Sequence, residues 1–299
     1  MNNVAVSVRA KLLNLSRAKD VPLNALMEQY ATGRFLYRLA QSRYRERFVL
    51  KGAQLFRIWE AEEYRPTRDL DLLGYGEATE GAIQSIFTEL TELEVDPHDG
   101  LEWGDVSVAS IRDEVAYGGV RAKVKVRLAG ARLGIQVDVG FGDAITPGVI
   151  EKEWHELLPF PSAHLLVYPA ETVIAEKLEA MVSLGMNNSR VKDFYDLYWL
   201  LSHQDFDGDV LTEAVVNTFI RRETELPDQT PRCLTEEFSN DAQKVTQWNA
   251  FLRKGGMPKV ELSEVVGCIS GFLMPVLEKK VGSMKWSSKE QWQLSGIFG

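Results

Sequence analysis

The chain has 299 residues, of which 45% are hydrophobic and 26% charged, and its 34 Lys and Arg against 43 Asp and Glu give a net charge of −9. This is the composition of a globular protein of about two domains, and it excludes a disordered or collagen-like chain. The two cysteines, Cys233 and Cys268, stand far apart, which excludes a disulfide scaffold and a paired-cysteine zinc site.

The N-terminal segment lacks the apolar run and the small-residue cleavage site of a secretion signal. The longest apolar stretch, Val265–Leu277, is shorter than the roughly 20 residues that span a bilayer. We therefore expect a soluble, cytoplasmic protein with no membrane partner, and isolated cysteines fit that compartment.

The first half of the chain alternates helical and strand periodicity, with turn residues between the elements. Pro66 ends a helix, because proline cannot continue one and disfavours the helical conformation of the residue before it. In chain order we expect helical residues 4–47, the strand Phe48–Leu50, the helix Ala53–Glu63, the strand Asp69–Leu73, the helix Thr79–Leu93, the strand Val106–Val108, and the hairpin strands Val120–Leu128 and Leu133–Phe141.

From Pro169 onward the periodicity is helical. The sequence therefore predicts an α+β fold, with an α+β first half and an all-helical second half. The helices expected there are Glu171–Leu184, Lys192–Leu201, Asp209–Arg221, Glu236–Leu252 and Leu262–Lys280.

Asp69 and Asp71 are the first residues that could carry chemistry. Residues i and i+2 of a strand share a face, so the two carboxylates lie side by side and repel each other unless a cation joins them. Hard oxygen ligands without a nearby Cys or His favour Mg²⁺ or Mn²⁺ over zinc. An edge strand that merely exposes two acids would show the same pattern.

Asp138 strengthens the metal hypothesis. It is a lone carboxylate in the middle of an apolar strand, which is costly unless the carboxylate has a partner. If this strand neighbours Asp69–Leu73, three carboxylates converge, as two divalent ions would require. A salt bridge to an arginine of the hairpin is the alternative.

Two features suggest contacts with a polyanion. Lys51-Gly52 lies where a strand meets a helix, and glycine lets the backbone approach a phosphate closely. The hairpin strand places four cations on one face, a spacing that suits a nucleic-acid phosphate backbone or a triphosphate as well as it suits a plain solvated strand. These four candidate RNA-binding residues are Arg121, Lys123, Lys125 and Arg127.

The second half contributes Lys177 and two acids. Asp193 and Asp196 are i and i+3, so they share a helical face. Ser189 or Asn188 could cap that helix, and Lys177 could equally be an ordinary surface residue.

Taken together, these motifs resemble the signature of the nucleotidyltransferase superfamily, in which a Gly-led turn and helix precede an Asp-x-Asp strand, as in Thr67–Asp71. The segments Glu171–Ala180 and Ser189–Leu197 resemble one branch of it, the AbiEii family of toxins, which includes the MenT toxins. The likeness covers about residues 34–200. The superfamily turn usually reads Gly-Ser, whereas this chain has Gly52-Ala53, so phosphate contact there would use backbone N–H groups and Lys51.

The resemblance implies a nucleotidyltransferase-type mixed sheet core with N-terminal helices over residues 1–165. A helical domain over residues 166–299 would then contribute Lys177 and Asp193 to the site. Asp69, Asp71, Lys177 and Asp193 would be catalytic, although Asp196 lies close enough to take the place of Asp193. By this reading Asp69, Asp71 and Asp138 hold the metal, and the nucleotide contacts Lys51, Gly52, Thr67, Arg68, Asp138, Arg190 and Asp196.

Members of the family are the toxin halves of bacterial toxin–antitoxin pairs, and the characterised MenT toxins transfer nucleotides to the 3′ end of tRNA. We therefore expect a metal-dependent nucleotidyltransferase toxin that uses an NTP to modify RNA, first of all the 3′ end of tRNA, and so blocks translation. Its partners would be the NTP, tRNA and a cognate antitoxin, for instance a winged-helix regulator acting without direct contact.

Two alternatives stay open at this point. One is a nucleotidyltransferase that modifies a small-molecule or protein hydroxyl. The other is a binding protein that keeps the fold and has lost catalysis. The sequence also leaves open which NTP and which tRNA are used.

Overall fold

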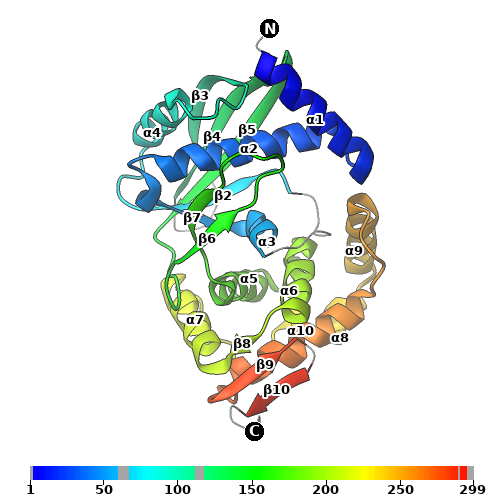
Figure 1. Cartoon of the computed structure of the whole chain (residues 1–299). Helices are drawn as coiled ribbons and strands as arrows, with labels where there is room; N and C mark the ends of the chain where they lie inside the picture. The colour runs from blue at the N-terminus through cyan, green and yellow to red at the C-terminus, as the bar shows by residue number, and fades with distance from the viewer. Residues whose placement is uncertain (1–2, 60–66, 112–117, 289, 295–299) are drawn as a thin grey trace. The chain divides into compact units, whose positions relative to one another are not determined.

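Alternation of apolar and polar residues builds a seven-stranded mixed sheet in the first part of the chain (Figure 1). The computed structural model describes residues 3–59, 67–111, 118–288 and 290–294. The chain forms two compact units: unit 1 comprises Met1–Gly142 with Ile150–Tyr168, and unit 2 comprises Asp143–Val149 with Pro169–Gly299.

The sheet of unit 1 has the strand order β3-β4-β5-β2-β1-β7-β6. Strand β2 is central: it pairs in parallel with β5 and antiparallel with β1, and β5 continues into the antiparallel hairpin with β4. The strands are β1 (Phe48–Lys51), β2 (Leu70–Gly74), β3 (Leu101–Ile111), β4 (Gly119–Leu128), β5 (Ala131–Phe141), β6 (Ile150–Trp154) and β7 (Ala163–Val167).

Helices cover the apolar face of this sheet, and α2 lies across the strands in Figure 1. Phe35 of α2, Phe48 of β1 and Phe87 of α4 meet in the core, with ring centroids 5.4 Å and 5.6 Å apart for the two contacts of Phe87. The helical elements of unit 1 are α1 (Asn3–Lys19), α2 (Leu23–Gln41), η1 (Arg45–Arg47), η2 (Gly52–Gln54), α3 (Leu55–Ile58) and α4 (Glu80–Glu92).

Several predicted elements of unit 1 need correction. The stretch 4–47, predicted as helical with later segments at Asn24–Arg38 and Leu36–Arg47, consists of α1, α2 and the short η1. Asp20 adopts a positive φ and Pro22 is the N-cap of α2, which separates α1 from α2. The described part of the helix predicted over Ala53–Glu63 ends at Ile58, and residues 60–63 and the break at Pro66 lie outside the described residues. Strand β3 is longer than predicted, and β6 and β7 were not predicted.

Unit 2 is mainly helical, as predicted, but it also contains a small sheet in the order β10-β9-β8. The expectation of helices alone was therefore wrong, since these short strands carry no clear alternation and are held by an aromatic cluster of Phe206, Phe272, Trp286 and Trp292. The elements are α5 (Ala170–Leu184), η3 (Gly185–Asn187), α6 (Val191–His203), β8 (Phe206–Asp207), α7 (Gly208–Arg221), η4 (Arg232–Leu234), α8 (Glu236–Ser239), α9 (Ala242–Gly255), α10 (Leu262–Leu277), β9 (Met284–Ser287) and β10 (Glu290–Leu294).

The helix predicted over Glu236–Leu252 is broken in the structure. Asp241 starts a new helix, α9, because its side chain accepts a hydrogen bond from the backbone N–H of Lys244 at 2.9 Å. Within the described part of the chain, no helix combines the length and apolarity needed to cross a membrane.

Candidate active site

A row of charged residues crosses the polar face of the unit 1 sheet. In register, Lys51 of β1 lies opposite Asp71 of β2, Asp71 opposite Asp138 of β5, and Asp138 opposite Arg121 of β4. Their neighbours Leu70 and Leu72 face the buried side and are at most 1% exposed. The alternation in each strand therefore puts Lys51, Asp138 and Arg121, which come from separate strands, on the same face of the sheet as Asp71.

Asp69 lies just before β2 and is tied to β5 by a side chain that the sequence reading did not select. The Nε2 group of Gln136 donates a hydrogen bond to Asp69 Oδ1 at 3.1 Å. Gln54 Nε2 donates to the backbone carbonyl of Asp69 at 3.2 Å. The carboxylate of Asp69 itself is exposed, while Asp71 is half-buried.

Asp138 has an arginine partner. The guanidinium of Arg121 donates to both carboxylate oxygens of Asp138, with Nε at 2.8 Å from Oδ1 and Nη2 at 2.7 Å from Oδ2. This bidentate pair is the salt bridge named above as the alternative to metal binding, and it meets the need of a lone carboxylate for a partner. The pair also neutralises Arg121, one of the four cations of β4 that were predicted to bind RNA.

Gly52 has a specific structural role beside Asp71. Its φ is +71°, which favours glycine, and a Cβ added there would lie 2.2 Å from Asp71 Oδ2. The backbone of the turn therefore passes directly against a predicted metal ligand, and no larger residue fits without moving that carboxylate.

Lys51, Thr67 and Arg68 surround this turn in the sequence. Lys51 Nζ lies 5.1 Å from the ring centroid of Tyr168, a cation–π contact that the sequence reading missed. Arg68 is exposed and its Nε is 3.7 Å from Glu28 Oε2, and Thr67 is half-buried. Only Lys51 is thus both part of the sheet and beside Asp71.

The donor set of this face bears on the metal hypothesis. Asp69 and Asp71 supply two carboxylates, and magnesium is commonly held by one or two carboxylates and by the substrate phosphates. Among the described residues, no group of three or more His, Cys, Asp or Glu side chains is arranged to hold a metal ion. The residues present therefore fit Mg²⁺ or Mn²⁺ through Asp69 and Asp71, while Arg121 engages Asp138.

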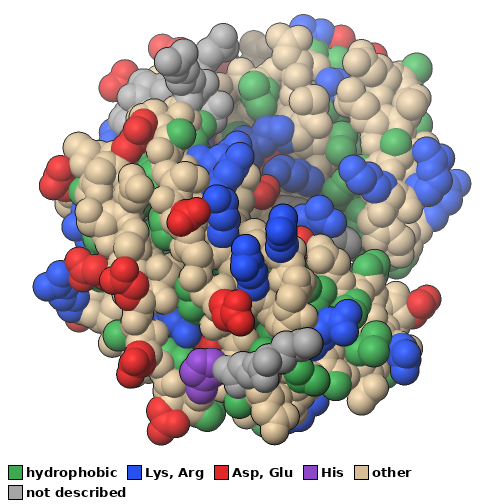
Figure 2. All heavy atoms as spheres, turned by 90° about the horizontal axis from the view of Figure 1, so that it is seen from above, with side chains coloured by type: hydrophobic (Ala, Val, Ile, Leu, Met, Phe, Trp, Pro, Cys, Tyr) green, Lys and Arg blue, Asp and Glu red, His purple; other side chains and the backbone are tan. Residues whose placement is uncertain are grey.

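The cationic side of β4 is partly neutralised. Lys125 Nζ lies 3.0 Å from Asp105 Oδ2, with both side chains exposed. Lys123 and Arg127 are also exposed, on the same face as Arg121. Figure 2 shows Lys and Arg side chains gathered near the middle of one face of the molecule.

In unit 2, Lys177 of α5 bridges two acids of α6. Its Nζ lies 2.7 Å from Asp193 Oδ1 and 2.7 Å from Asp196 Oδ2. The side chain of Lys177 is 14% exposed and those of the acids 1% and 0%, so Lys177 is not an ordinary surface residue. Burial alone would lower the pKa of Lys177, but the charges of Asp193 and Asp196 outweigh it, so the pKa is raised.

The start of α6 carries further contacts to this cluster. Arg190 Nε lies 2.9 Å from Asp193 Oδ2. Neither Ser189 nor Asn188 is the N-cap of α6, which is Arg190. Asn188 Oδ1 accepts a hydrogen bond from the backbone N–H of Arg190 at 2.7 Å. The buried Lys244, which the sequence reading did not select, donates to the Asn188 carbonyl at 2.8 Å. The capping explanation for Asp193 is therefore replaced by ion pairing.

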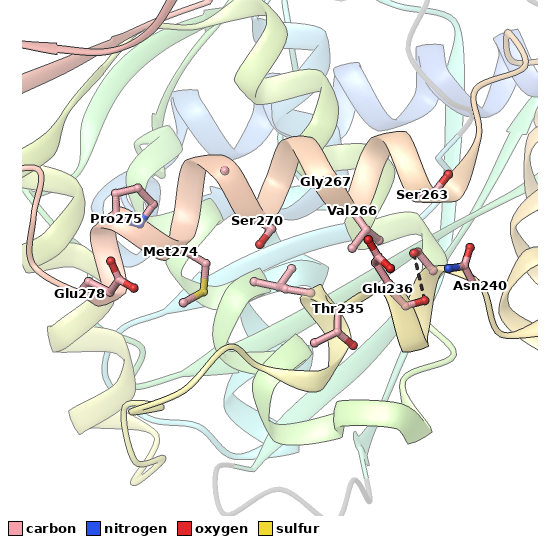
Figure 3. A pocket seen from close by; sticks show the side chains of 13 residues that line it. Thr235, Glu236, Asn240, Ser263, Val266, Gly267, Ser270, Met274, Pro275 and Glu278 are labelled. Atoms are coloured by element: carbon pink, nitrogen blue, oxygen red, sulfur yellow. Dashed lines mark hydrogen bonds between the residues drawn. The ribbon is translucent and has the colours of Figure 1, made fainter.

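Unit 2 contains a hollow of about 690 Å³ that is lined by none of the predicted site residues. Figure 3 shows it between the α10 side chains Ser263, Ser270 and Met274 and the segment that carries Thr235 and Glu236. None of its lining residues was selected as a catalytic or nucleotide-binding candidate, so volume alone does not locate the chemistry.

Comparisons with known proteins agree with the sequence reading. The profile of the family described as "Nucleotidyl transferase AbiEii toxin, Type IV TA system" matches residues 34–265. No curated protein matches the chain.

Two similar solved structures come from Helicobacter pylori. One is JHP933, with a TM-score of 0.51 and 15% identity over 86% of this chain and 93% of that chain. The other is described as a putative nucleotidyltransferase, with a TM-score of 0.51 and 15% identity over 87% of this chain and 97% of that chain. At this identity the likeness concerns the fold, and it confirms the predicted α+β class.

Proposed function

The chain belongs to the AbiEii family of nucleotidyltransferase toxins of type IV toxin–antitoxin systems, and on this basis we propose that it transfers nucleotides from an NTP to RNA, first of all to the 3′ end of tRNA. The observation that carries the proposal is the position of Asp71, two residues after Asp69, directly against the backbone of Gly52. Carboxylates suit a divalent cation, and a glycine turn lets the backbone approach phosphates closely, which are the two needs of nucleotidyl transfer.

In the proposed reaction a terminal hydroxyl oxygen of the RNA attacks the α-phosphorus of the NTP. A new P–O bond forms, the bond to pyrophosphate breaks, and the hydroxyl proton passes to a base or to water. A divalent cation at Asp69 and Asp71 would neutralise triphosphate charge and lower the pKa of the attacking hydroxyl. The backbone at Gly52 would bind phosphate oxygens, and Lys51 would contribute a cation beside Asp71.

We assign Lys177 and Asp193 to the same reaction through the family resemblance. The raised pKa of Lys177 keeps the lysine protonated, as the stabilisation of a phosphoryl group would require, and Asp193 and Asp196 offset its charge in this structure. Arg190 and Asp196 belong to the same cluster and enter the proposal as residues that hold Lys177 and Asp193 in place.

RNA as the acceptor is supported by the exposed cations Lys123 and Arg127 on β4. The pairing of Arg121 with Asp138 and of Lys125 with Asp105 reduces the free charge of this strand. A small-molecule or protein hydroxyl is therefore retained as an outcome of the test below. Membership of the family implies a partner antitoxin, which we propose acts without contacting this chain. We also propose a cytoplasmic location, because NTP and tRNA are both present there.

The test incubates the protein with each α-³²P-labelled NTP in turn, Mg²⁺ or Mn²⁺, and total RNA, followed by gel analysis. We expect label to enter an RNA of tRNA size with release of pyrophosphate, and EDTA to abolish the label. Label that enters only protein or small molecules, or no label with any NTP, would contradict RNA as the acceptor.

A further inference from the structure

A second hollow of unit 2, of about 330 Å³, has walls of unusual composition. It lies between the C-terminal half of α6 and the loop that joins α9 to α10. Aromatic rings line the α6 side, through Tyr195, Tyr198, Trp199 and His203, and Pro258 and Lys259 line the loop side.

Two of these rings form a flat stacking surface. The rings of Trp199 and His203 are stacked, with centroids 4.3 Å apart and an interplanar angle of 5°. His203 is exposed, and its Nδ1 lies 2.8 Å from the carbonyl oxygen of Trp199, a contact that holds the imidazole over the indole. The surface is therefore ordered before any ligand arrives, which lowers the entropy cost of stacking a planar group on it.

Lys259 is an exposed cation that lines the groove on the loop side. Two more exposed cations, Arg253 and Lys254, lie in the last turn of α9, just before this loop. Two acids offset part of this charge: Glu261 pairs with Lys259 at 3.0 Å, and Glu264 accepts a hydrogen bond from Tyr198. The segment keeps a net positive charge in a chain whose total is −9.

We propose that this groove binds a single-stranded segment of the RNA acceptor, with a base stacked on the Trp199–His203 pair and a phosphate beside Lys259. Aromatic rings combined with cations are the recurring means of holding single-stranded nucleic acid. The inference rests on the proposed function, because it names where the acceptor is held.

The position of the groove along α6 supports this assignment. Trp199 follows Asp196 by three residues, so the two lie one turn apart on the same helix. A base stacked on Trp199 would therefore be held by the same helix that carries Asp193 and Asp196.

The experiment measures the anisotropy of a fluorescein-labelled ten-nucleotide single-stranded RNA with the full chain at several salt concentrations. We expect Trp199→Ala to weaken binding about five- to 100-fold and Trp199→Phe to retain most of it. Lys259→Glu should weaken binding and lower the slope of log affinity against log salt by about 0.7. Lys280→Glu is the control, because Lys280 is an exposed lysine paired with Glu278 two residues away, as Lys259 is with Glu261.

A second readout is independent of affinity. RNA that carries 4-thiouridine, irradiated on the wild-type chain, should crosslink to peptides that contain residues 195–203 or 253–264. The groove proposal would be overturned if Trp199→Ala and Lys259→Glu both bound the RNA with wild-type affinity and the crosslinks fell on other peptides. The proposed function would stand in that case if the wild type still labelled RNA. Failure of the wild type both to bind single-stranded RNA and to label RNA would overturn the two proposals together.

Discussion

At the scale of single residues, the contact of Gly52 with Asp71 limits most strictly which residue can stand at position 52. A turn with φ of +71° brings backbone atoms against a carboxylate so closely that a methyl group has no room. The acid and the turn come from different segments, so neither can move without displacing the other.

We predict that Gly52→Ala reduces turnover strongly, because a Cβ placed 2.2 Å from Asp71 Oδ2 must displace that carboxylate. The control is Gly130→Ala, since Gly130 has φ of +84° but nothing within 4 Å of an added Cβ. Both variants should lose about 1 kcal/mol of stability from backbone strain, measured by denaturant unfolding. Equal activity of the two would show that contact with Asp71 is unimportant.

Asp69→Ala and Asp71→Ala should each abolish nucleotide transfer, because a cation held by two carboxylates is lost when either is removed. Stability should change by about 1 kcal/mol or less, since both lie on the polar side of the sheet. Activity and melting temperature are compared with those of Asp105→Ala, which removes an exposed strand acid that is paired with Lys125. Near-wild-type turnover in either site variant would rule out the metal role.

Lys177→Ala is expected to lower kcat far more than Lys152→Ala, which removes an exposed lysine of β6. Because Asp193 and Asp196 would be left buried without their lysine, a stability loss of about 3–5 kcal/mol should accompany it. Turnover is therefore measured well below the melting temperature of the variant. A folded Lys177→Ala protein with wild-type kcat would reduce Lys177 to a structural role.

At the scale of elements, strand β4 shows how a sequence pattern changes meaning once its neighbours are known. Its alternation puts four cations on one face, as the sequence predicts. The register with β5 then places Arg121 against Asp138, and Asp105 of β3 reaches Lys125. With these two acids counted, the strand offers a net charge of about +2 to an RNA backbone.

Reversal of two of these charges tests the strand. Lys123→Glu combined with Lys125→Glu should weaken tRNA binding and make its salt dependence shallower by up to about two units, while NTP affinity is largely kept. The measurement is tRNA affinity at several salt concentrations with NTP affinity alongside. An unchanged salt slope would identify β4 as a solvated strand, and loss of NTP affinity alone would favour a small acceptor.

At the scale of the whole molecule, each unit contains its own buried charges. In unit 1, the side chain of Arg34 is 0% exposed, and its Nη1 lies 3.1 Å from Glu156 Oε1, with Asp99 and Arg38 in the same network. Burial raises the pKa of Glu156 to about 7, although the charge of Arg34 opposes the shift. Global stability should therefore depend on this one carboxyl group.

The sign of the effect follows from the direction of the shift. Between its ordinary pKa of 4.5 and about 7, Glu156 holds a proton in the folded state that the unfolded chain has released. The free energy of unfolding should fall as pH rises through this window, by roughly 3 kcal/mol. Glu156→Gln should flatten that slope, whereas Glu153→Gln, in exposed β6, should not. Equal slopes in all three proteins would contradict the assignment.

The residue pattern by itself determined much of this protein. Periodicity located the central strand with Asp71, the hairpin with Asp138, and most helices of unit 2, because apolar spacing directly reflects which face is buried. It missed β6, β7 and β8–β10, which are short strands of two to five residues and show too few alternations to be recognised. It also merged α8 with α9, although Asp241 carries a recognisable N-cap signal.

Only the tertiary structure decided which of the candidate groups meet. Pairing of Arg121 with Asp138, the approach of Gly52 to Asp71, and the bridge from Lys177 to Asp193 and Asp196 each join residues from separate elements. The sequence names such residues by type and spacing, but strand register and helix packing set their partners. Those partners in turn determine whether a charge is free for a ligand or already neutralised within the protein.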